Sequence, residues 1–441
     1  MARLAGPVVA AELGWIFMGM VDTLMVGRIS AQAIGAVSLG TAIYLAVAIF
    51  GMGLLLGLDT LVSQAFGAGR MEDCHRFLIH GVYLSLILTP LLSGIIWWTI
   101  PFLSSWGLNQ EVLALTLPYL EAMVWSTLPL LIYTTFRRYL QGMGMVKPVM
   151  VVLVTANLVN VVANWILVFG NLGAPAMGVE GAGWATFISR VFMAGSLVGY
   201  TLYYEQVHGM GLFDTTLALE LSRLRQLWSL GFPAAMQIAL ELGAFATATA
   251  LAAKLDSASL AAHQIALTAA EFTFMVPLGV SSAGAVRVGH ALGRKDPRGA
   301  ARAGWTALLF GTGFMACSAV AFQVFPSLIL RSFTRDPAVV SIGISLLVVA
   351  AYFQLFDGVQ VVSTGILRGA GDTRTPMTVS LVGHWLVGLP VGYTLCFLQN
   401  WGVIGLWVGF CVGLMAVGVV LLLVWSRRVR LLQRELTPSF G

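Results

Sequence analysis

Apolar runs of about 20 residues recur along the whole chain, and each is long enough for one helix to cross a bilayer. Short polar or basic connections separate these runs. Helices rather than strands are expected, because an open sheet edge has no hydrogen-bond partners in lipid. The pattern therefore predicts an all-α integral membrane protein with twelve transmembrane helices. The expected crossings are residues 4–26, 33–63, 77–99, 111–136, 148–169, 179–204, 226–253, 257–291, 303–330, 338–366, 376–398 and 402–426.

The amino-acid composition supports the same class. The chain is 58% hydrophobic and only 10% charged, whereas a soluble domain carries roughly 25% charged residues. The four cysteines show no metal-ligand spacing, so neither a metal site nor a disulfide framework is expected. The sequence also lacks a nucleotide-binding loop, a serine elbow and a zinc-binding helix motif, which argues against an enzyme.

The Lys and Arg residues collect on one side of the predicted membrane topology. Of 24 such residues, 18 lie at the termini or on connections after even-numbered crossings, and 4 lie on the opposite connections. Cytoplasmic connections carry the excess of positive charge in membrane proteins. The split predicts a multi-pass protein of the cell membrane with both termini in the cytoplasm. It also accounts for the net charge of +5 without a nucleic-acid partner.

The first half of the chain returns in the second half. The segment from Pro7 to Gly67 corresponds without a gap to the segment from Pro233 to Gly293. An even number of crossings in each half would place both copies in the same orientation, related by an axis along the membrane normal. We therefore expect an amino-terminal six-helix lobe (1–204), a cytoplasmic linker (205–225) and a carboxy-terminal six-helix lobe (226–441), with a cavity between the lobes.

An acidic residue in the middle of a membrane span is costly, so each such residue is a candidate for function. Asp22 lies deep in the first crossing, with no cationic residue at helical spacing before Arg28. It could bind a cation or a proton, or it could be a packing residue hydrogen-bonded to its neighbours. Asn160 and Asn164 lie one turn apart on the fifth crossing, and Thr186 on the sixth could add a hydroxyl. Carboxylate and amide oxygens suit Na⁺, although polar residues also hold helices together.

A second acidic pair belongs to the carboxy-terminal half. Glu241 lies in the middle of the seventh crossing and Asp357 in the tenth. If the two carboxylates face each other, they could share one cation or hold one proton between them. Gln264 in the eighth crossing is a plausible neighbour. Glu271, Phe353, His384 and Trp385 could line a substrate cavity, where aromatic rings would attract flat organic cations.

Several motifs together resemble the multidrug and toxic compound extrusion (MATE) family, and most closely its NorM-type branch. The resemblance covers essentially the whole chain. The motifs are MVDTLMVGR (20–28), GLDTLVSQAFGAG (57–69), LQGMGMVKP (140–148), NVVANWILVFG (160–170), GVEGAGWAT (178–186), AAHQIA (261–266), FMVPLGVSSAGAVRVGHALGR (274–294) and GILRGAGDTRTP (365–376).

The resemblance implies a V-shaped fold of two six-helix lobes and export of cationic or amphiphilic compounds, driven by inward Na⁺ or H⁺. No further cofactor is implied, and the expected partners are small organic molecules and the bilayer, with the protein acting as a monomer. The amino-lobe cation site would be Asp22, Asn160, Asn164 and Thr186. The carboxy-lobe site would include Glu241 and Asp357. Phe353, one turn before Asp357, stands where some relatives carry Tyr, so a phenolic contact is missing there.

Two other functions were weighed. A lipid-linked oligosaccharide flippase of the wider superfamily would need a more cationic cavity for a pyrophosphate, whereas the intramembrane charges here are mainly acidic. A non-transporting membrane protein gives no reason to keep buried acids in both halves. The sequence therefore favours a cation-coupled multidrug antiporter.

Overall fold

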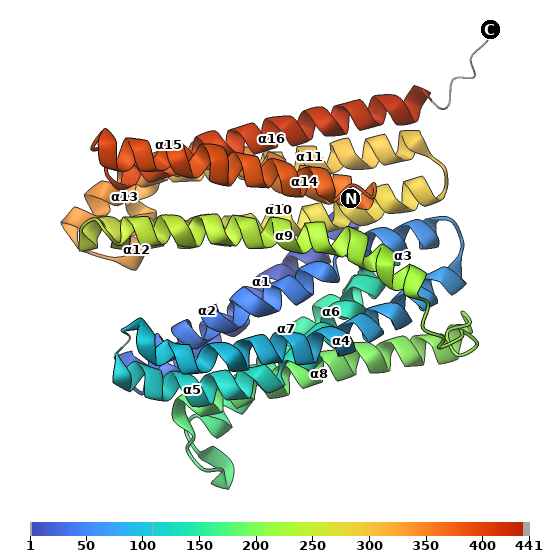
Figure 1. Ribbon diagram of the computed structural model, residues 1–441, viewed down its shortest axis with the longest axis horizontal. Helices are drawn as coiled ribbons and strands as arrows, with labels where there is room; N and C mark the ends of the chain where they lie inside the picture. Colours follow the sequence, from blue (N-terminus) through green and yellow to red (C-terminus); the bar gives the residue numbers. More distant parts are fainter. Residues whose placement is uncertain (1, 108, 435–441) are drawn as a thin grey trace. The chain divides into compact units, whose positions relative to one another are not determined.

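The computed structural model describes residues 2–107 and 109–434, and these residues form helices joined by short turns, with no strand (Figure 1). The helices are α1 (Ala2–Val26), α2 (Ala31–Leu54), α3 (Gly57–Gly67), α4 (Met71–Leu103), η1 (Ser104–Trp106), α5 (Gln110–Trp125), α6 (Thr127–Gly142), α7 (Lys147–Leu167), η2 (Asn171–Gly173), α8 (Gly178–His208), α9 (Leu221–Ala252), α10 (Ser257–Gly293), α11 (Pro297–Val324), α12 (Pro326–Phe333), α13 (Pro337–Gly369), α14 (Arg374–Ser380), η3 (Leu381–Gly388), α15 (Leu389–Tyr393), η4 (Thr394–Leu398) and α16 (Val403–Arg434).

The predicted number of membrane crossings is confirmed for the described residues. Eleven helical segments are long and apolar enough to span a bilayer, and the bent pair α5 and α6 forms a twelfth. Capping side chains mark several of the helix starts, as the Oγ of Ser30 does by accepting the backbone N–H of Ala33 at 3.1 Å. Such a bond satisfies one of the amide groups that a helix start leaves unpaired.

The helices pack into two compact units. One runs from Ala10 to Ala235, and the other combines the residues up to Val9 with those from Met236 onward. We call them the amino unit and the carboxy unit. The helices α1 and α9 each contribute residues to both units. The lobe boundaries expected from the repeat remain a prediction, because they follow the duplicated sequence rather than the packing.

Two of the crossings in the amino unit are broken. The second crossing changes from α2 to α3 at Leu55 and Leu56, and Asp59 lies in the first turn of α3. An acid is favoured there by the positive end of the helix dipole, and Asp59 also pairs with Arg138 at 3.4 Å. The fourth crossing bends by 45° between α5 and α6, at Ser126. At both breaks the backbone bonds tighten to a three-residue spacing, as in those from Leu56 N to the carbonyl of Gly53 at 3.1 Å and from Ser126 N to that of Met123 at 3.0 Å.

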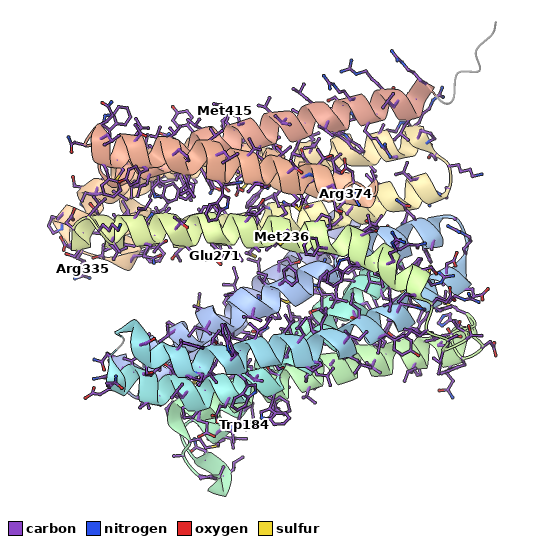
Figure 2. The ribbon with its side chains drawn as sticks, in the orientation of Figure 1. Trp184, Met236, Glu271, Arg335, Arg374 and Met415 are labelled. Atoms are coloured by element: carbon purple, nitrogen blue, oxygen red, sulfur yellow. The ribbon has the colours of Figure 1, made fainter. Side chains whose placement is uncertain are left out.

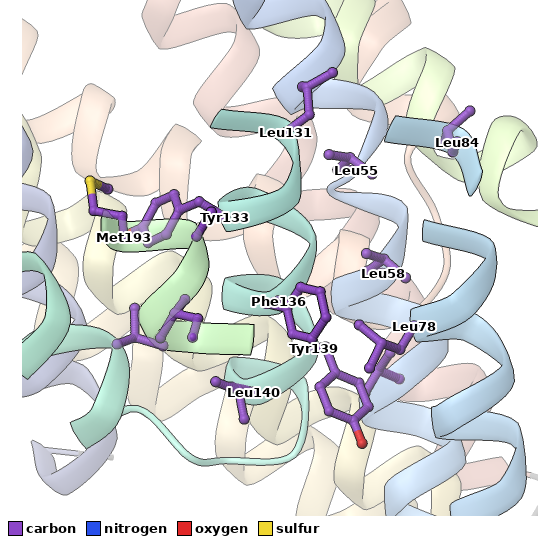
Figure 3. Packing of buried hydrophobic residues seen from close by; sticks show 14 of the residues in the cluster. Leu55, Leu58, Leu78, Leu84, Leu131, Tyr133, Phe136, Tyr139, Leu140 and Met193 are labelled. Carbon is purple, nitrogen blue, oxygen red and sulfur yellow. The ribbon is translucent and has the colours of Figure 1, made fainter. Parts of the chain in front are cut away.

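Aliphatic and aromatic side chains close the core of the amino unit around these breaks. Leu55 and Leu58 from the second crossing belong to the same buried cluster as Leu131 and Phe136 from α6 (Figure 3). Burial of side chains of this size typically contributes about 1.5–3 kcal/mol each in water. In a bilayer that driving force is weaker, and close packing between helices takes its place.

In the carboxy unit, small residues let the last two crossings approach closely. A side chain at Gly409 of α16 would collide with the backbone of Gly392 in α15. The crossing that contains α15 also includes the π-helical stretches η3 and η4. Such π-helical turns are uncommon and often lie at functional sites.

Candidate functional site

Asp22 on α1 lies at the centre of a buried polar site in the amino unit. Its Oδ1 accepts hydrogen bonds from the Nδ2 atoms of Asn160 at 3.0 Å and Asn164 at 2.7 Å. Its Oδ2 accepts the hydroxyl of Thr186 at 2.7 Å. All four side chains are at most 4% exposed. The structure therefore brings together the four residues expected at the amino-lobe cation site.

Local sequence explains how three helices meet at this carboxylate. Asn160 and Asn164 lie on one face of α7 because they are one turn apart. Gly14 lets α1 approach α7, since a side chain at that position would press against Leu153. The backbone carbonyl of Gly14 also accepts the Nδ2 of Asn157 at 3.0 Å. Asp22 follows two turns later on the same helix and thus lies beside the two amides.

The donor set of the site suits a small hard cation or a proton. One carboxylate, two amides and one hydroxyl supply oxygen ligands of the kind that Na⁺ prefers. The Oδ1 atom of Asn164 is buried and has no hydrogen-bond partner among the described residues. A buried acceptor without a partner is unusual, and it points to a missing ligand or water at this position. The residues present therefore fit the ion that the resemblance implies.

Arg190 is the residue near this site to which the sequence assigned no role. It lies one turn after Thr186 on α8, so both project from the same face of that helix. Its Nη1 donates to the Oγ of Ser126 at 2.5 Å, and its guanidinium lies 4.8 Å from the ring centre of Tyr44. An arginine within a membrane span was the available signal, because such residues are rare and usually functional.

The two acids of the second pair interact electrostatically within the carboxy unit. The Oε1 of Glu241 on α9 accepts the Nε2 of Gln237 at 3.0 Å, the Nε2 of Gln360 at 2.6 Å and the Oγ of Ser380 at 3.2 Å. Asp357 lies nearly one turn before Gln360 on α13, is 7% exposed and interacts electrostatically with Glu241. Among the described residues, no side chain or backbone group donates a hydrogen bond to the Asp357 carboxylate.

Two of the expected carboxy-lobe neighbours lie elsewhere. Gln264 is exposed and makes no hydrogen bond to either acid within the described chain, because the core-facing position of that turn of α10 is taken by His263. Phe353 is buried among aromatic rings, 6.2 Å from Phe245 and 5.7 Å from Trp407 between ring centres. It therefore contributes to the packing of the carboxy unit, and its role in a substrate cavity stays a prediction.

The remaining cavity candidates have different surroundings. Glu271 on α10 is exposed (Figure 2). His384 is 3% exposed, and its Nδ1 contacts the backbone carbonyl of Ser380 at 3.1 Å. Trp385 is half-buried, and its Nε1 donates to the backbone carbonyl of Leu240 at 2.9 Å. Their role in a substrate cavity stays a prediction.

Comparison with known proteins places this geometry in a family. A family model described as MatE matches residues 7–166 and 233–394, which correspond to the two copies of the repeat. The probable multidrug resistance protein NorM of Mesorhizobium japonicum is 34% identical over 97% of this chain and 93% of its own length. The multidrug resistance protein NorM of Vibrio cholerae is 33% identical over 98% of this chain and 95% of its own length.

Solved structures share the fold at lower identity. The eukaryotic MATE transporter AtDTX14 superposes with a TM-score of 0.86 at 21% identity, covering 99% of this chain and 98% of that one. A MATE structure in the straight conformation gives a TM-score of 0.89 at 19% identity, covering 98% of this chain and 96% of that one. With both stretches of the family model matched and relatives aligned along nearly its full length, this chain belongs to the MatE family.

Proposed function

We propose that this chain is a secondary active antiporter that exports cationic or amphiphilic organic compounds in exchange for inward Na⁺ or H⁺. The observation that carries the proposal is the buried Asp22 carboxylate, held by neutral donors from α7 and α8 inside a membrane span. The names of the relatives, which are multidrug resistance proteins, support export of drug-like compounds.

The chemistry of the Asp22 site supports its role in coupling. The carboxylate is ionised in water at neutral pH, and inside the protein the bonds from Asn160, Asn164 and Thr186 stabilise the negative charge. A bound Na⁺ or a proton would neutralise that charge. The amides and the hydroxyl would then lose a charged acceptor and rearrange around a neutral site. The two forms of the site therefore favour different arrangements of α1, α7 and α8.

Coupling requires that the different helix arrangements of the charged and the neutralised Asp22 site also differ in their affinity for the exported compound. A ligand shifts a conformational equilibrium only when its affinities for the two states differ, and the effect between two sites is reciprocal. A potential of 100 mV supplies about 2.3 kcal/mol per net charge that moves inward, which corresponds to roughly 50-fold in the export gradient. Export of a singly charged compound therefore draws on the potential only when more than one cation enters for each compound that leaves.

Glu241 and Asp357 supply a second place for charge in the carboxy unit. The Oε1 of Glu241 accepts hydrogen bonds from the side chains of Gln237 and Gln360. Among the described residues, Asp357 interacts electrostatically with Glu241 and accepts no hydrogen bond. A proton or a cation between the two acids would therefore relieve the repulsion between their charges. We propose that this pair is the second coupling site, built from different helices than the first.

The remaining features of the proposal concern location and partners. The excess of Lys and Arg on one set of connections supports a cell-membrane protein with both termini in the cytoplasm. We expect it to act as a monomer on small organic cations. Two six-helix lobes, residues 1–204 and 226–441 joined by the linker 205–225, are the expected moving parts.

The test is gradient-driven efflux from proteoliposomes loaded with the fluorescent cation ethidium. Efflux is measured under an imposed Na⁺ gradient at equal pH, and separately under an imposed pH gradient without Na⁺, with the potential clamped. We expect one gradient to accelerate efflux several-fold. The double variant Asp22→Asn with Glu241→Gln should lose this acceleration, while Asp214→Asn, which changes an exposed acid, should keep it.

Two results would contradict the proposal in different ways. If neither gradient accelerates efflux by the wild-type protein, cation-coupled antiport is wrong. If a gradient does accelerate efflux but the double variant responds fully, the function stands and the two coupling sites are misassigned.

A further inference from the structure

Arg190 lies in an arrangement that a packing residue does not require. It is 4% exposed within a membrane span, and its Nε atom is buried without a hydrogen-bond partner among the described residues. Its Nη1 donates to the Oγ of Ser126 at 2.5 Å. Its guanidinium also lies over two aromatic rings, 4.8 Å from the centre of Tyr44 and 6.0 Å from that of Trp15. The charge is therefore held by neutral groups.

The Asp22 carboxylate is an opposite charge that interacts with Arg190. In the described chain no carboxylate forms an ion pair with Arg190, but the charges of Arg190 and Asp22 attract each other. The phenol of Tyr119, which bonds to Thr41 at 2.8 Å, also interacts with both charges. Thr186 contacts Asp22 directly from one turn earlier on the same helix face as Arg190. Arg190 therefore lies one helical turn from a residue that bonds to Asp22, and it forms no ion pair with that carboxylate.

The other partner of Arg190 lies at a structural break. Ser126 separates α5 from α6, where the crossing bends by 45°. Its Oγ donates to the backbone carbonyl of Met123 at 2.6 Å and accepts the Arg190 Nη1–H. Serine at a helix bend stabilises the freed backbone groups. If the hydrogen bond from Arg190 to this hydroxyl is weakened or lost, the bend angle should therefore change.

We propose that Arg190 is a positioning residue that links the occupancy of the Asp22 site to the bend at Ser126. The inference rests on the proposed function, because it needs Asp22 to bind a cation. While Asp22 carries its negative charge, that charge attracts Arg190, and this attraction competes with the hydrogen bond from Arg190 to Ser126. When a cation neutralises Asp22, the attraction disappears and Arg190 is held by Ser126 and the two rings alone. The bend at Ser126 is the element that changes.

This arrangement predicts opposite changes in cation affinity for substitutions at Arg190 and at Ser126. Arg190→Met removes a positive charge that repels the incoming cation, so the cation should bind more tightly. Ser126→Ala removes the competing partner, which leaves Arg190 free to move toward Asp22 and so weakens cation binding. Because the two variants remove opposite ends of one hydrogen bond, a purely structural role would shift cation binding in the same direction in both.

The experiment follows the thermal unfolding of purified protein in detergent during two titrations. The probes are NaCl against choline chloride at pH 8, and pH at zero Na⁺. We expect Arg190→Met to lower the half-saturating Na⁺ concentration, or to raise the pH midpoint, by an amount equivalent to about fivefold or more in affinity. Ser126→Ala should shift the same quantity in the opposite direction. Arg287→Met, which removes the exposed arginine of α10, serves as the matched control and should leave it unchanged.

A second measurement reports on the bend. Amide hydrogen exchange of the peptide that contains Ser126, corrected for intrinsic rates, should change on cation addition in the wild type and not in Arg190→Met. If that variant does not fold, Ser126→Ala carries both readouts alone. Shifts of the same sign in the two variants, or an unchanged bend on cation addition, would overturn the inference.

The proposed function fails separately. In a Glu241→Gln background, where the second acidic pair does not respond, Asp22→Asn should remove the cation effect on unfolding, and if it does not, the Asp22 site is wrong whatever the Arg190 variants show. If Asp22→Asn removes the effect but the Arg190 and Ser126 variants behave like the wild type, the site stands and the link to the bend is refuted.

Discussion

Replacing Asp22 by Asn is the most informative perturbation of the amino-unit site, because it removes the charge and keeps the shape. The amide oxygen of the new side chain can still accept from Asn160 and Asn164, whose bonds both end on the same carboxylate oxygen. The new amide nitrogen would take the place of the oxygen that Thr186 contacts, and the hydroxyl can rotate to accept from it. The packing of three helices is therefore retained.

The magnitude follows from two opposing effects. A hydrogen bond to a charged group contributes about 1.5–3 kcal/mol and a neutral one about 0.5–1.5 kcal/mol, so three weakened bonds lose roughly 3 kcal/mol together. The variant also no longer buries a charge, whose desolvation costs several kcal/mol. These effects offset each other, and the stability of the cation-free protein should change by no more than about 2 kcal/mol.

The additional stability that the bound cation gives should be lost completely. A ligand at a hundredfold excess over its Kd stabilises the protein that binds it by about 2.7 kcal/mol. The assay measures thermal unfolding in a Glu241→Gln background, where the second acidic pair does not respond. It compares proteins with Asp22 and with Asp22→Asn, with and without saturating Na⁺ at fixed pH, and at pH 8 against pH 6 without Na⁺. The protein with Asp22 should be stabilised by one of these changes, and the protein with Asp22→Asn should lose that response while unfolding near the cation-free Asp22 form.

Asp214→Asn supplies the matched control, since Asp214 is exposed in the connection between α8 and α9. It makes the same chemical change and should keep the full cation response. The reasoning is refuted if Asp22→Asn retains that response, because the charge would then not be part of the binding site. It is also refuted if the variant unfolds far below the wild type in the absence of cation, because Asp22 would then hold the helices together.

Two further substitutions test the surrounding architecture. Arg137→Met leaves the buried carboxylate of Glu12 without the cation it pairs with, which typically costs about 3–5 kcal/mol; the midpoint of thermal unfolding should fall clearly, and a wild-type midpoint would show that the pair contributes little. Glu220 lies outside the membrane spans, and the hydrogen bond from Arg223 at 2.9 Å, reinforced by the charges of Arg223 and Arg76, holds the pKa of its carboxyl below the usual 4.5. A lowered folded-state pKa contributes stability above the unfolded value that is lost as the pH falls through the folded one. Cleavage of residues 206–220 by pepsin should therefore accelerate below about pH 4.5, and a Glu220→Gln variant that keeps the same pH dependence would contradict this.

Much of the fold follows from patterns that are local in the sequence. Apolar runs of membrane length and capping residues such as Ser30 determine where the helices begin and end. The break at Ser126 also has a local signal, because Pro129 lacks the amide hydrogen that would bond to the carbonyl of Trp125 and its ring crowds that carbonyl. The hydrogen bond from Arg190 of α8 to Ser126 has no such local signal and is seen only in the tertiary structure.

The candidate site shows the same division. The spacing of Asn160 and Asn164 predicts that they share a helix face, and the carboxylate of Asp22 completes a plausible ligand set. Gln264 illustrates the opposite outcome, because a polar residue next to a core-facing one on the same helix points away from the core. Arg190 could be recognised as unusual, but its partner lies 64 positions away and sequence spacing does not reveal it.

The central claim is that cation entry and drug export are obligatorily exchanged. In the most direct measurement, the dye gradient replaces the ion gradient as the driving force. Vesicles are loaded with ethidium, no ion gradient is imposed, and uptake of ²²Na⁺ or of protons is followed as the dye leaves. We expect the outward dye gradient to drive net uptake of one of these cations into the vesicles, so that this cation accumulates inside, and the double variant Asp22→Asn with Glu241→Gln to abolish the uptake. Dye movement by the wild-type protein without any movement of Na⁺ or H⁺ would contradict the account.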